Sequence, residues 1–393
     1  MNELKKRSIG IDILKAISLI SVIIYHFYEY KGTYIGVILF FVISGYLITE
    51  VLYERDDSYF SFIKRRYNKI FPPLIAVLTF TYLAFYYFYD YISEKLIFSS
   101  LSSLFGVSNL YQISTGMSYF ERSGDLFPLL HTWSLSIEIQ FYILFPFLIY
   151  LFKKLKLDTK IIIAIIMLLS FISAGLMFYK EYINYDISAI YYGTDTRIFS
   201  IFMGSAFYFL FKDRDLENEK QKLNTISYVC LGVIVVIVLS VDYLSKSNYY
   251  GFLFLISILG SFMTVTSLKT GFLDFENPVA NTLAKLGEHS YVYYLWQYPL
   301  MIFSLEFFKW SDIDYNYTVG IQRRKKKKKI TMCSSHLYSW NTGNNFNNFI
   351  RNFIWIFDKE KTGVDNFEKN IFSFICGIFS IFTYKLRNKF RRS

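Results

Sequence analysis

The apolar residues of this chain fall into long runs that are separated by short polar and charged segments. A helix needs roughly 20 apolar residues to cross a bilayer, so runs of about this length predict membrane spans. They lie at 9–29, 33–53, 70–90, 128–152, 159–178, 190–211, 225–243, 251–268, 286–307 and 371–386. A further run at 94–112 has SSLSSLFGVSN at its centre and is poorly suited to lipid. The pattern predicts an all-α fold, a polytopic transmembrane helical bundle.

Basic residues between the runs orient the predicted helices. Cytoplasmic loops are enriched in Lys and Arg, so the cluster at 5–7 predicts a cytoplasmic N-terminus. If 94–112 is re-entrant or peripheral, the basic segments at 64–69, 153–156 and 212–222 all lie on the cytoplasmic side. The charge pattern therefore predicts about ten spans with both termini in the cytoplasm.

The composition agrees with a membrane protein. Hydrophobic residues make up 53% and charged residues 19% of the chain, against about 25% charged residues in a typical soluble domain. The net charge of +11 comes from cations between the spans, so the expected partner is the lipid bilayer and not nucleic acid. The three cysteines lack metal-type spacing, and neither a metal site nor a disulfide framework is expected.

Ionisable residues stand out within the first apolar run, IDILKAISLISVIIYHF, which contains Asp12, Lys15 and His26. A helix turns by about 100° and rises about 1.5 Å per residue, so Lys15 and His26 share one face, about 16 Å apart. Such groups at membrane depth are costly and commonly functional. The predicted orientation puts Lys15 toward the cytoplasm and His26 toward the outer side.

The second run and the segment after it carry glycines and cations. Gly36 and Gly45 would let another helix or a ligand approach closely. The segment SYFSFIKRRYNKIFPP contains Arg66 and Lys69, which could hold an anionic phosphate group or could serve only as a topology signal. The two prolines at 72–73 fit the first turn of the third predicted helix.

The stretch LLHTWSLSIEIQFYILFP places His131, Ser134 and Glu138 at positions i, i+3 and i+7, on one helical stripe. This combination suits general acid–base chemistry. The alternative is an ordinary helix start at the membrane boundary, with Thr132 as its cap and Trp133 in the aromatic belt. Glu138 fits this alternative poorly, because apolar residues surround it within the run.

Two later segments contain further polar candidates. Asp195 and Arg197 lie at the external start of the run 190–211, where they either pair with each other or contact a polar substrate. In LGEHSYVYYLWQYPL, an aromatic belt explains most residues, but it does not explain Gln297.

Together these segments resemble the acyltransferase-3 family of integral-membrane O-acyltransferases. That family has a basic residue, ten further residues and a histidine in its first helix, like Lys15 and His26, although its basic residue is usually arginine. HTWSLSIEIQFY and SYVYYLWQYP are similar to its HTWSLSxEEQFY and SYxxYLWHxP signatures, with Gln297 where histidine is common. The tracts KRRYNKIFP and YYGTDTR also resemble family motifs, and all motifs follow in order between about residues 8 and 305.

The resemblance implies a multi-pass enzyme of the bacterial plasma membrane without a bound cofactor. It would transfer acetyl from cytoplasmic acetyl-CoA to hydroxyls of a cell-surface, capsular polysaccharide. The residues it implies in catalysis, with His26 as general base or as transient acetyl carrier, are Lys15, His26, His131 and Glu138. Those implied in donor binding are Lys15, Arg66 and Lys69. Those implied in substrate binding are Ser134, Asp195, Arg197 and Gln297.

Two other functions stay open at this point. Peptidoglycan O-acetylation is one, but such proteins often append an extracytoplasmic esterase-like domain for which this chain has no room. That shortage favours a stand-alone polysaccharide modifier. The other is a non-enzymatic transporter of polysaccharide or acyl groups, which predicts inverted repeats and Gly- or Pro-broken helix pairs. Neither feature is clear in the sequence.

The pattern of spans fails after residue 307. The lysines at 325–329 would lie outside the cell, against the positive-inside rule. We therefore predict a membrane-embedded acyltransferase domain at 1–310 and an atypical basic and polar tail at 311–393. A frameshift near residue 323 would explain the tail, with 371–386 as a fortuitous last span and impaired activity. A genuine variable tail that binds anionic polymer or lipid is the alternative.

Overall fold

The computed structural model describes residues 8–55, 58–116, 127–242 and 245–306 of the chain. These residues form helices and contain no strand, which confirms the all-α fold. The chain divides into two units, Met1–Ile302 and Phe303–Ser393, and the first contains every candidate site residue. The tail at 311–393 and the predicted span at 371–386 lie outside the described residues.

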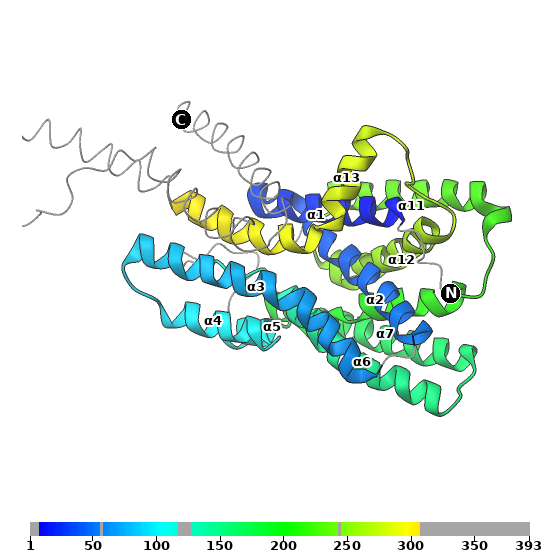
Figure 1. The fold of residues 1–393 in the computed structure, drawn as a ribbon, viewed down its shortest axis with the longest axis horizontal. Helices are drawn as coiled ribbons and strands as arrows, with labels where there is room; N and C mark the ends of the chain where they lie inside the picture. Colours follow the sequence, from blue (N-terminus) through cyan, green and yellow to red (C-terminus); the bar gives the residue numbers. More distant parts are fainter. Residues whose placement is uncertain (1–7, 56–57, 117–126, 243–244, 307–393) are drawn as a thin grey trace, which may run out of the picture. The chain divides into compact units, whose positions relative to one another are not determined.

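Seven helical segments among the described residues are long and apolar enough to cross a membrane, in agreement with a polytopic bundle. Four correspond to single α-helices, and three more extend into short 3₁₀ or π segments. Their α-helical parts are α1 (Ile9–Tyr28), α2 (Gly36–Glu54), α3 (Tyr59–Tyr89), α6 (Thr132–Lys154), α7 (Thr159–Tyr182), α11 (Lys220–Ser240) and α12 (Leu253–Lys269) (Figure 1).

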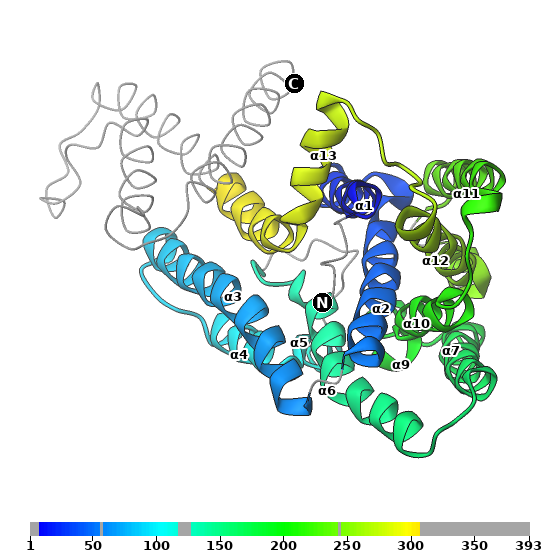
Figure 2. The same cartoon turned by 45° about the vertical axis from the view of Figure 1, so that its right-hand side comes forward.

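Helix α2 lies at the centre of a tightly packed group, with α10 (Phe199–Phe211), α12 and α1 against it (Figure 2). A Cβ atom at Gly45 would meet the backbone oxygen of Ile201, and one at Gly204 would meet that of Val42. The backbones of α2 and α10 therefore touch, as small residues in membrane helices allow. Of the two interpretations of Gly45, close helix packing is the one that the fold supports.

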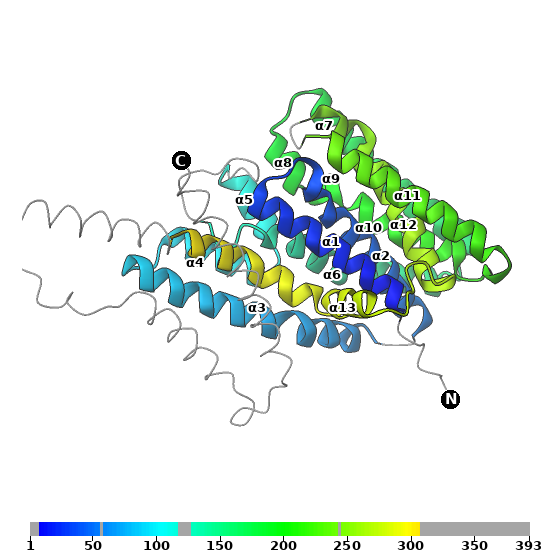
Figure 3. The same cartoon turned by 90° about the horizontal axis from the view of Figure 1, so that it is seen from above.

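Helix α13 (Pro278–Glu288) lies across the first turns of α1 (Figure 3). Asn277 caps α13 by accepting a hydrogen bond from the Ala280 amide at 2.8 Å. A Cβ atom at Gly287 would collide with the Asp12 carbonyl oxygen, so the two helices approach without a side chain between them. Helical residues then continue from 290 to 306. The predicted span at 286–307 is thus two helices that meet at His289.

Helix α3 is much longer than its predicted span at 70–90. It contains 31 residues, and Ser58 caps its start by accepting from the Ser61 amide. At 1.5 Å per residue it is about 46 Å long, whereas a hydrocarbon core is about 30 Å thick. The basic residues therefore lie on the first turns of α3 and not in a loop. The prediction for the prolines at 72–73 was wrong, because they lie inside the helix.

The segment at 94–112 forms two short helices, α4 (Glu94–Leu104) and α5 (Ser108–Ser114). They are separated at Gly106, whose φ of 67° favours glycine. Eleven and seven residues are too few to cross a bilayer. Both helices pack against α6, and α4 also packs against α3 (Figure 1). This agrees with a segment that does not span.

The predicted span at 190–211 is interrupted near its external end. Residues Ile187–Tyr192 form α8, Thr194–Arg197 form α9, and α10 begins at Phe199. Gly193 between α8 and α9 has an extended conformation and breaks the helix there. The break places Asp195 and Arg197 on a short separate turn, which affects where both side chains point.

Candidate active site

Helix α1 carries the two ionisable groups that the sequence analysis singled out. Ser8 caps the helix by accepting from the Ile11 amide at 3.3 Å. Lys15 forms an ion pair with Asp12 one turn earlier, with Nζ and Oδ1 3.2 Å apart, and its side chain is 24% exposed. His26, near the other end of the helix, is buried. The side chains of α1 therefore reach two levels of the bundle, about 16 Å apart along the axis.

The outer level joins His26 to the helix that begins at residue 290. The Nδ1 atom of His26 lies 2.8 Å from Oε1 of Gln297, and both side chains are buried. The ring of Tyr298 contacts His26 edge-on at 4.8 Å between centroids, and it contacts the His131 ring at 5.3 Å. Tyr298 thus touches both imidazoles. We call His26, His131, Gln297, Tyr298 and Tyr294 the outer cluster.

His131 enters the outer cluster from the start of α6. Its side chain is fully buried, and neither ring nitrogen has a hydrogen-bond partner in the described part of the chain. The hydroxyl of Tyr294 donates to the His131 backbone oxygen at 2.8 Å, and the Ser134 hydroxyl donates to Tyr294 at 2.7 Å. Tyr294 therefore fixes the turn that carries His131. The sequence analysis assigned Tyr294 to an aromatic belt and therefore missed this role.

The inner level lies around Glu138, two helical turns after His131 on α6. The Tyr142 hydroxyl donates to Glu138 Oε2 at 2.6 Å, and the Ser44 hydroxyl of α2 donates to Tyr142 at 2.7 Å. The guanidinium of Arg66 lies 5.9 Å from the Tyr142 ring centre. Sequence reasoning missed Ser44 and Tyr142, since hydroxyl-bearing residues are common in this chain.

Cations from two helices approach Glu138. Lys69 lies within electrostatic range of Arg66, Lys15, Glu138 and Asp12. Arg66 and Lys69 come from α3, and Lys15 comes from α1. We call Lys15, Arg66, Lys69, Glu138 and Tyr142 the inner cluster. It contains more cations than anions, which suits an anionic ligand, and no described group of three or more His, Cys, Asp or Glu residues could hold a metal ion.

The two clusters are connected through helices that run in opposite directions. From Lys15 to His26, α1 passes from the inner to the outer cluster, and from His131 to Glu138, α6 passes back. Seven residues on α6 correspond to about 10 Å. The structure thus brings together residues 15, 26, 66, 69, 131, 134, 138 and 297 of the predicted site at two successive depths.

Asp195 and Arg197 do not pair with each other, contrary to one interpretation of the sequence. Asp195 Oδ2 pairs with Lys180 at 2.5 Å, and its side chain is 45% exposed. Arg197 is fully buried, its Nε donates to the Tyr191 carbonyl at 3.0 Å, and its guanidinium lies 4.4 Å from the Tyr191 ring centre. The break at Gly193 sends the two side chains into different surroundings. A contact of either residue with substrate stays a prediction.

The helix start on α6 is not an ordinary one. The N-cap residue is His131, without a capping hydrogen bond from its side chain, so Thr132 is not the cap. Trp133 is buried against Phe41 and Tyr191 and does not belong to an aromatic belt. Both parts of that alternative interpretation were wrong, because this end of α6 packs inside the bundle.

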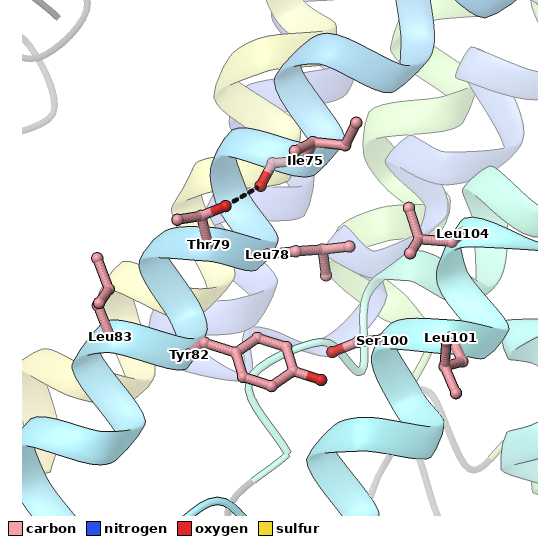
Figure 4. A pocket seen from close by; sticks show the side chains of 8 residues that line it. All are labelled: Ile75, Leu78, Thr79, Tyr82, Leu83, Ser100, Leu101 and Leu104. Carbon is pink, nitrogen blue, oxygen red and sulfur yellow. Dashed lines mark hydrogen bonds between the residues drawn. The ribbon is translucent and has the colours of Figure 1, made fainter.

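An apolar pocket of about 350 Å³ lies between α3 and α4 (Figure 4). The Thr79 hydroxyl donates to the Ile75 carbonyl, and the Ser100 hydroxyl donates to that of Leu96. The pocket therefore offers little polar chemistry, and it contains no residue of either cluster. The lining residues are Ile75, Leu78, Thr79, Tyr82, Leu83, Ser100, Leu101 and Leu104.

Comparison with known proteins agrees with this arrangement. The family profile described as "Acyltransferase domain" matches residues 8–318. The chain is 32% identical to O-acetyltransferase OatA of Staphylococcus aureus over 329 residues, covering 79% of the chain and 54% of that protein. It is 32% identical to peptidoglycan O-acetyltransferase OatA of Listeria monocytogenes over 309 residues, covering 74% and 49%. The chain thus spans about half the length of these curated relatives. No solved structure matches it.

Proposed function

The chain belongs to the Acyltransferase domain family, and on that basis we propose that it is a membrane O-acetyltransferase that acts on hydroxyls of a cell-envelope glycan. The observation that carries the proposal is the pair of clusters on α1 and α6. A cationic inner cluster lies on the predicted cytoplasmic side, and a buried histidine pair lies on the predicted outer side. An enzyme that joins a cytoplasmic donor to an external acceptor needs both.

We propose acetyl-CoA as the donor. Its phosphates are anionic, and Lys15, Arg66 and Lys69 supply cations from two helices. Lys69 is exposed and Lys15 is partly exposed, so both remain accessible to a ligand. Glu138, held by Tyr142, would keep the long cationic side chains in place. The thioester end of the donor would then point along α1 toward His26.

We propose His26 as the general base. The hydroxyl oxygen of the glycan attacks the acetyl carbonyl carbon, and His26 takes the hydroxyl proton. The new C–O bond forms, the C–S bond breaks, and the thiolate leaves and receives the proton from His26. His131 and Ser134 would contact the acceptor from α6. The same imidazole lone pair would serve if the acetyl group passed through His26.

Peptidoglycan is the acceptor that we favour, because the Listeria relative is named for it. Capsular polysaccharide, the first expectation from the sequence, becomes the second candidate. That expectation relied on the length of this chain. The similarity to the Listeria relative extends over 309 residues and so covers most of the membrane domain.

Cells that lack the native gene and express either the wild-type chain or His26→Ala would test the proposal. O-acetyl groups released by mild alkali would be measured on purified peptidoglycan and on capsular polysaccharide. We expect the wild type to acetylate peptidoglycan and His26→Ala to lower this by about 100-fold or more, the usual contribution of a general base. His289→Ala is the matched control, because His289 lies at the end of α13 beside Glu288 and outside both clusters.

Unchanged acetylation in His26→Ala at equal protein levels would remove His26 from the mechanism. Acetyl groups on capsular polysaccharide alone would contradict the proposed acceptor. A loss of glycan export in place of a loss of acetylation would support the transporter.

A further inference from the structure

The contact between His26 and Gln297 joins residues 271 positions apart in the chain. The two side chains come from α1 and from the helix that begins at residue 290, and they are 4% and 7% exposed. Their polar atoms are 2.8 Å apart, an ordinary hydrogen-bond length. Water is therefore largely excluded from this hydrogen bond.

The placement of the Gln297 amide oxygen toward His26 sets the direction of that hydrogen bond. The atom of Gln297 that faces His26 is the amide oxygen, which can only accept. The Nδ1 atom of His26 must then carry a proton. A neutral imidazole has one ring proton, so Nε2 carries the lone pair. Nε2 is therefore the ring nitrogen that can take a proton from a substrate.

The orientation of the imidazole ring is fixed by aromatic neighbours. The Tyr298 ring meets the His26 ring at 71°, and the Tyr25 ring lies 5.9 Å away at 59°. The edge-to-face contact with Tyr298 favours one orientation of the His26 ring over others. Tyr298 also follows Gln297 directly in the chain, so one helical turn supplies both the hydrogen bond and the ring contact.

We propose that Gln297 is a positioning residue that holds the His26 proton on Nδ1 and thereby keeps the lone pair of the ring on Nε2, the nitrogen that would act as the base. This inference rests on the proposed function for its catalytic meaning, and it changes the sequence-based role of Gln297 from substrate binding to orientation of the base. In the opposite arrangement the Gln297 amide nitrogen donates to Nδ1, and Nε2 carries the proton and cannot act as a base. The histidine that is common at this position in the family pattern can also accept from Nδ1–H.

The ring tautomer can be measured without any activity. The full chain, labelled with ¹⁵N in histidine and solubilised in detergent, would be studied by NMR at a pH where the ring is neutral. The chain has 4 histidines, and His26→Ala assigns the His26 signals. We expect a proton on Nδ1 in the wild type and a shift of the proton toward Nε2 in Gln297→Leu. A wild-type His26 with its proton on Nε2, or a tautomer that Gln297→Leu does not change, would overturn the proposal.

Enzyme kinetics can distinguish a role of Gln297 as hydrogen-bond acceptor for His26 from a merely structural role. Acetyl transfer from acetyl-CoA to peptidoglycan fragments would be measured with the same preparations. We expect Gln297→Leu to lower kcat by about 10- to 100-fold, the range that loss of an orienting partner costs metal-binding histidines, with KM for acetyl-CoA unchanged. Gln297→Glu and Gln297→His keep a hydrogen-bond acceptor at this position, so their kcat should stay within a few-fold of the wild-type value. Gln221→Leu, at an exposed position on α11, is the control.

An equal loss of kcat in Gln297→Glu and Gln297→Leu would show that the amide N–H matters, which contradicts the proposal. Failure of the proposed function gives a different result. The wild-type chain would then acetylate nothing, while the NMR measurement would still decide the tautomer.

Discussion

At the scale of single residues, the two clusters differ in how far the sequence predicted them. The common face of Lys15 and His26 follows from helix geometry alone, and the His131 stripe follows from its spacing. The partners do not follow from spacing. Tyr294 and Gln297 belong to a segment rich in aromatic residues, and only the packing of that segment against α1 and α6 distinguishes them from an aromatic belt.

The hydroxyl groups that bond within the inner cluster could not be identified from the sequence either. Ser44 lies in an apolar run between the buried residues Ile43 and Gly45, and no local pattern marks it. Its contact is with Tyr142, 98 positions away. Because a hydroxyl satisfies its hydrogen bond through tertiary contacts as readily as through its own helix, residue type alone cannot reveal such a partner.

The inner cluster allows a prediction about individual lysines. Lys64 and Lys69 both lie on α3 and are both exposed, and Lys69 lies within electrostatic range of Lys15 and Glu138. Lys64 lies five residues earlier, about 140° round the helix from Lys69, and so faces another direction. If the donor is anionic, Lys69→Ala should raise KM for acetyl-CoA about tenfold, since a hydrogen bond to a charged group contributes about 1.5–3 kcal/mol. Steady-state kinetics of the solubilised chain would measure the change.

Lys64→Ala is the control for that measurement and should leave KM for acetyl-CoA within twofold of the wild-type value. The effect of Lys69→Ala should also shrink as ionic strength rises, because salt screens exposed charges. Equal increases in KM for both variants would indicate a general effect of surface charge and would contradict a specific donor site.

At the scale of helices, the sequence predicts that a helix exists more readily than it predicts how long the helix is or whether it is interrupted. The apolar pattern predicted where α3 crosses the membrane but not that the helix begins at Tyr59, since the basic first turns extend past the hydrocarbon. The same pattern missed the break at Gly193, because apolar residues continue on both sides of it. Hydrophobicity reports contact with lipid or core, and it does not report whether the backbone stays helical.

Helix contact gives the clearest stability prediction at this scale. An alanine methyl group at Gly45 would press on the backbone of α10, which cannot move as a side chain can. We expect Gly45→Ala to destabilise the chain by about 1–3 kcal/mol, the usual cost of overpacking. A thermal unfolding curve of the detergent-solubilised protein would show a lower Tm.

Gly232→Ala provides a matched control on α11. A Cβ atom at Gly232 meets nothing within 4 Å, and alanine favours a helix over glycine by about 1 kcal/mol. Its Tm should equal or exceed that of the wild type. An unchanged Tm in Gly45→Ala would mean that the α2–α10 contact is looser than described.

At the scale of the whole molecule, the sequence supplied the fold class and the family through the order of its motifs. It did not settle the C-terminal part. The predicted frameshift near residue 323 concerns residues outside those described, and it stays a prediction. The DNA sequence of this gene and of close relatives would test it, because an intact reading frame with the same tail in relatives would contradict a frameshift.

The membrane orientation of the chain can be tested at two positions on either side of α7, one before it and one after it. Lys154 ends α6 on the predicted cytoplasmic side, and Tyr185, 51% exposed, follows α7 on the predicted external side. In a cysteine-free background, Tyr185→Cys should react with a membrane-impermeant thiol reagent on intact cells. Lys154→Cys should react only after the cells are opened.

This labelling pattern depends on whether α4 and α5 cross the membrane. If 94–112 spanned the bilayer, every later helix would reverse, and Lys154→Cys would react on intact cells while Tyr185→Cys would be protected. Such a reversal would also place Glu138 nearer the outer surface than His131, and a cytoplasmic donor could then no longer meet the inner cluster. The labelling experiment therefore tests the orientation on which the proposed transfer across the membrane depends.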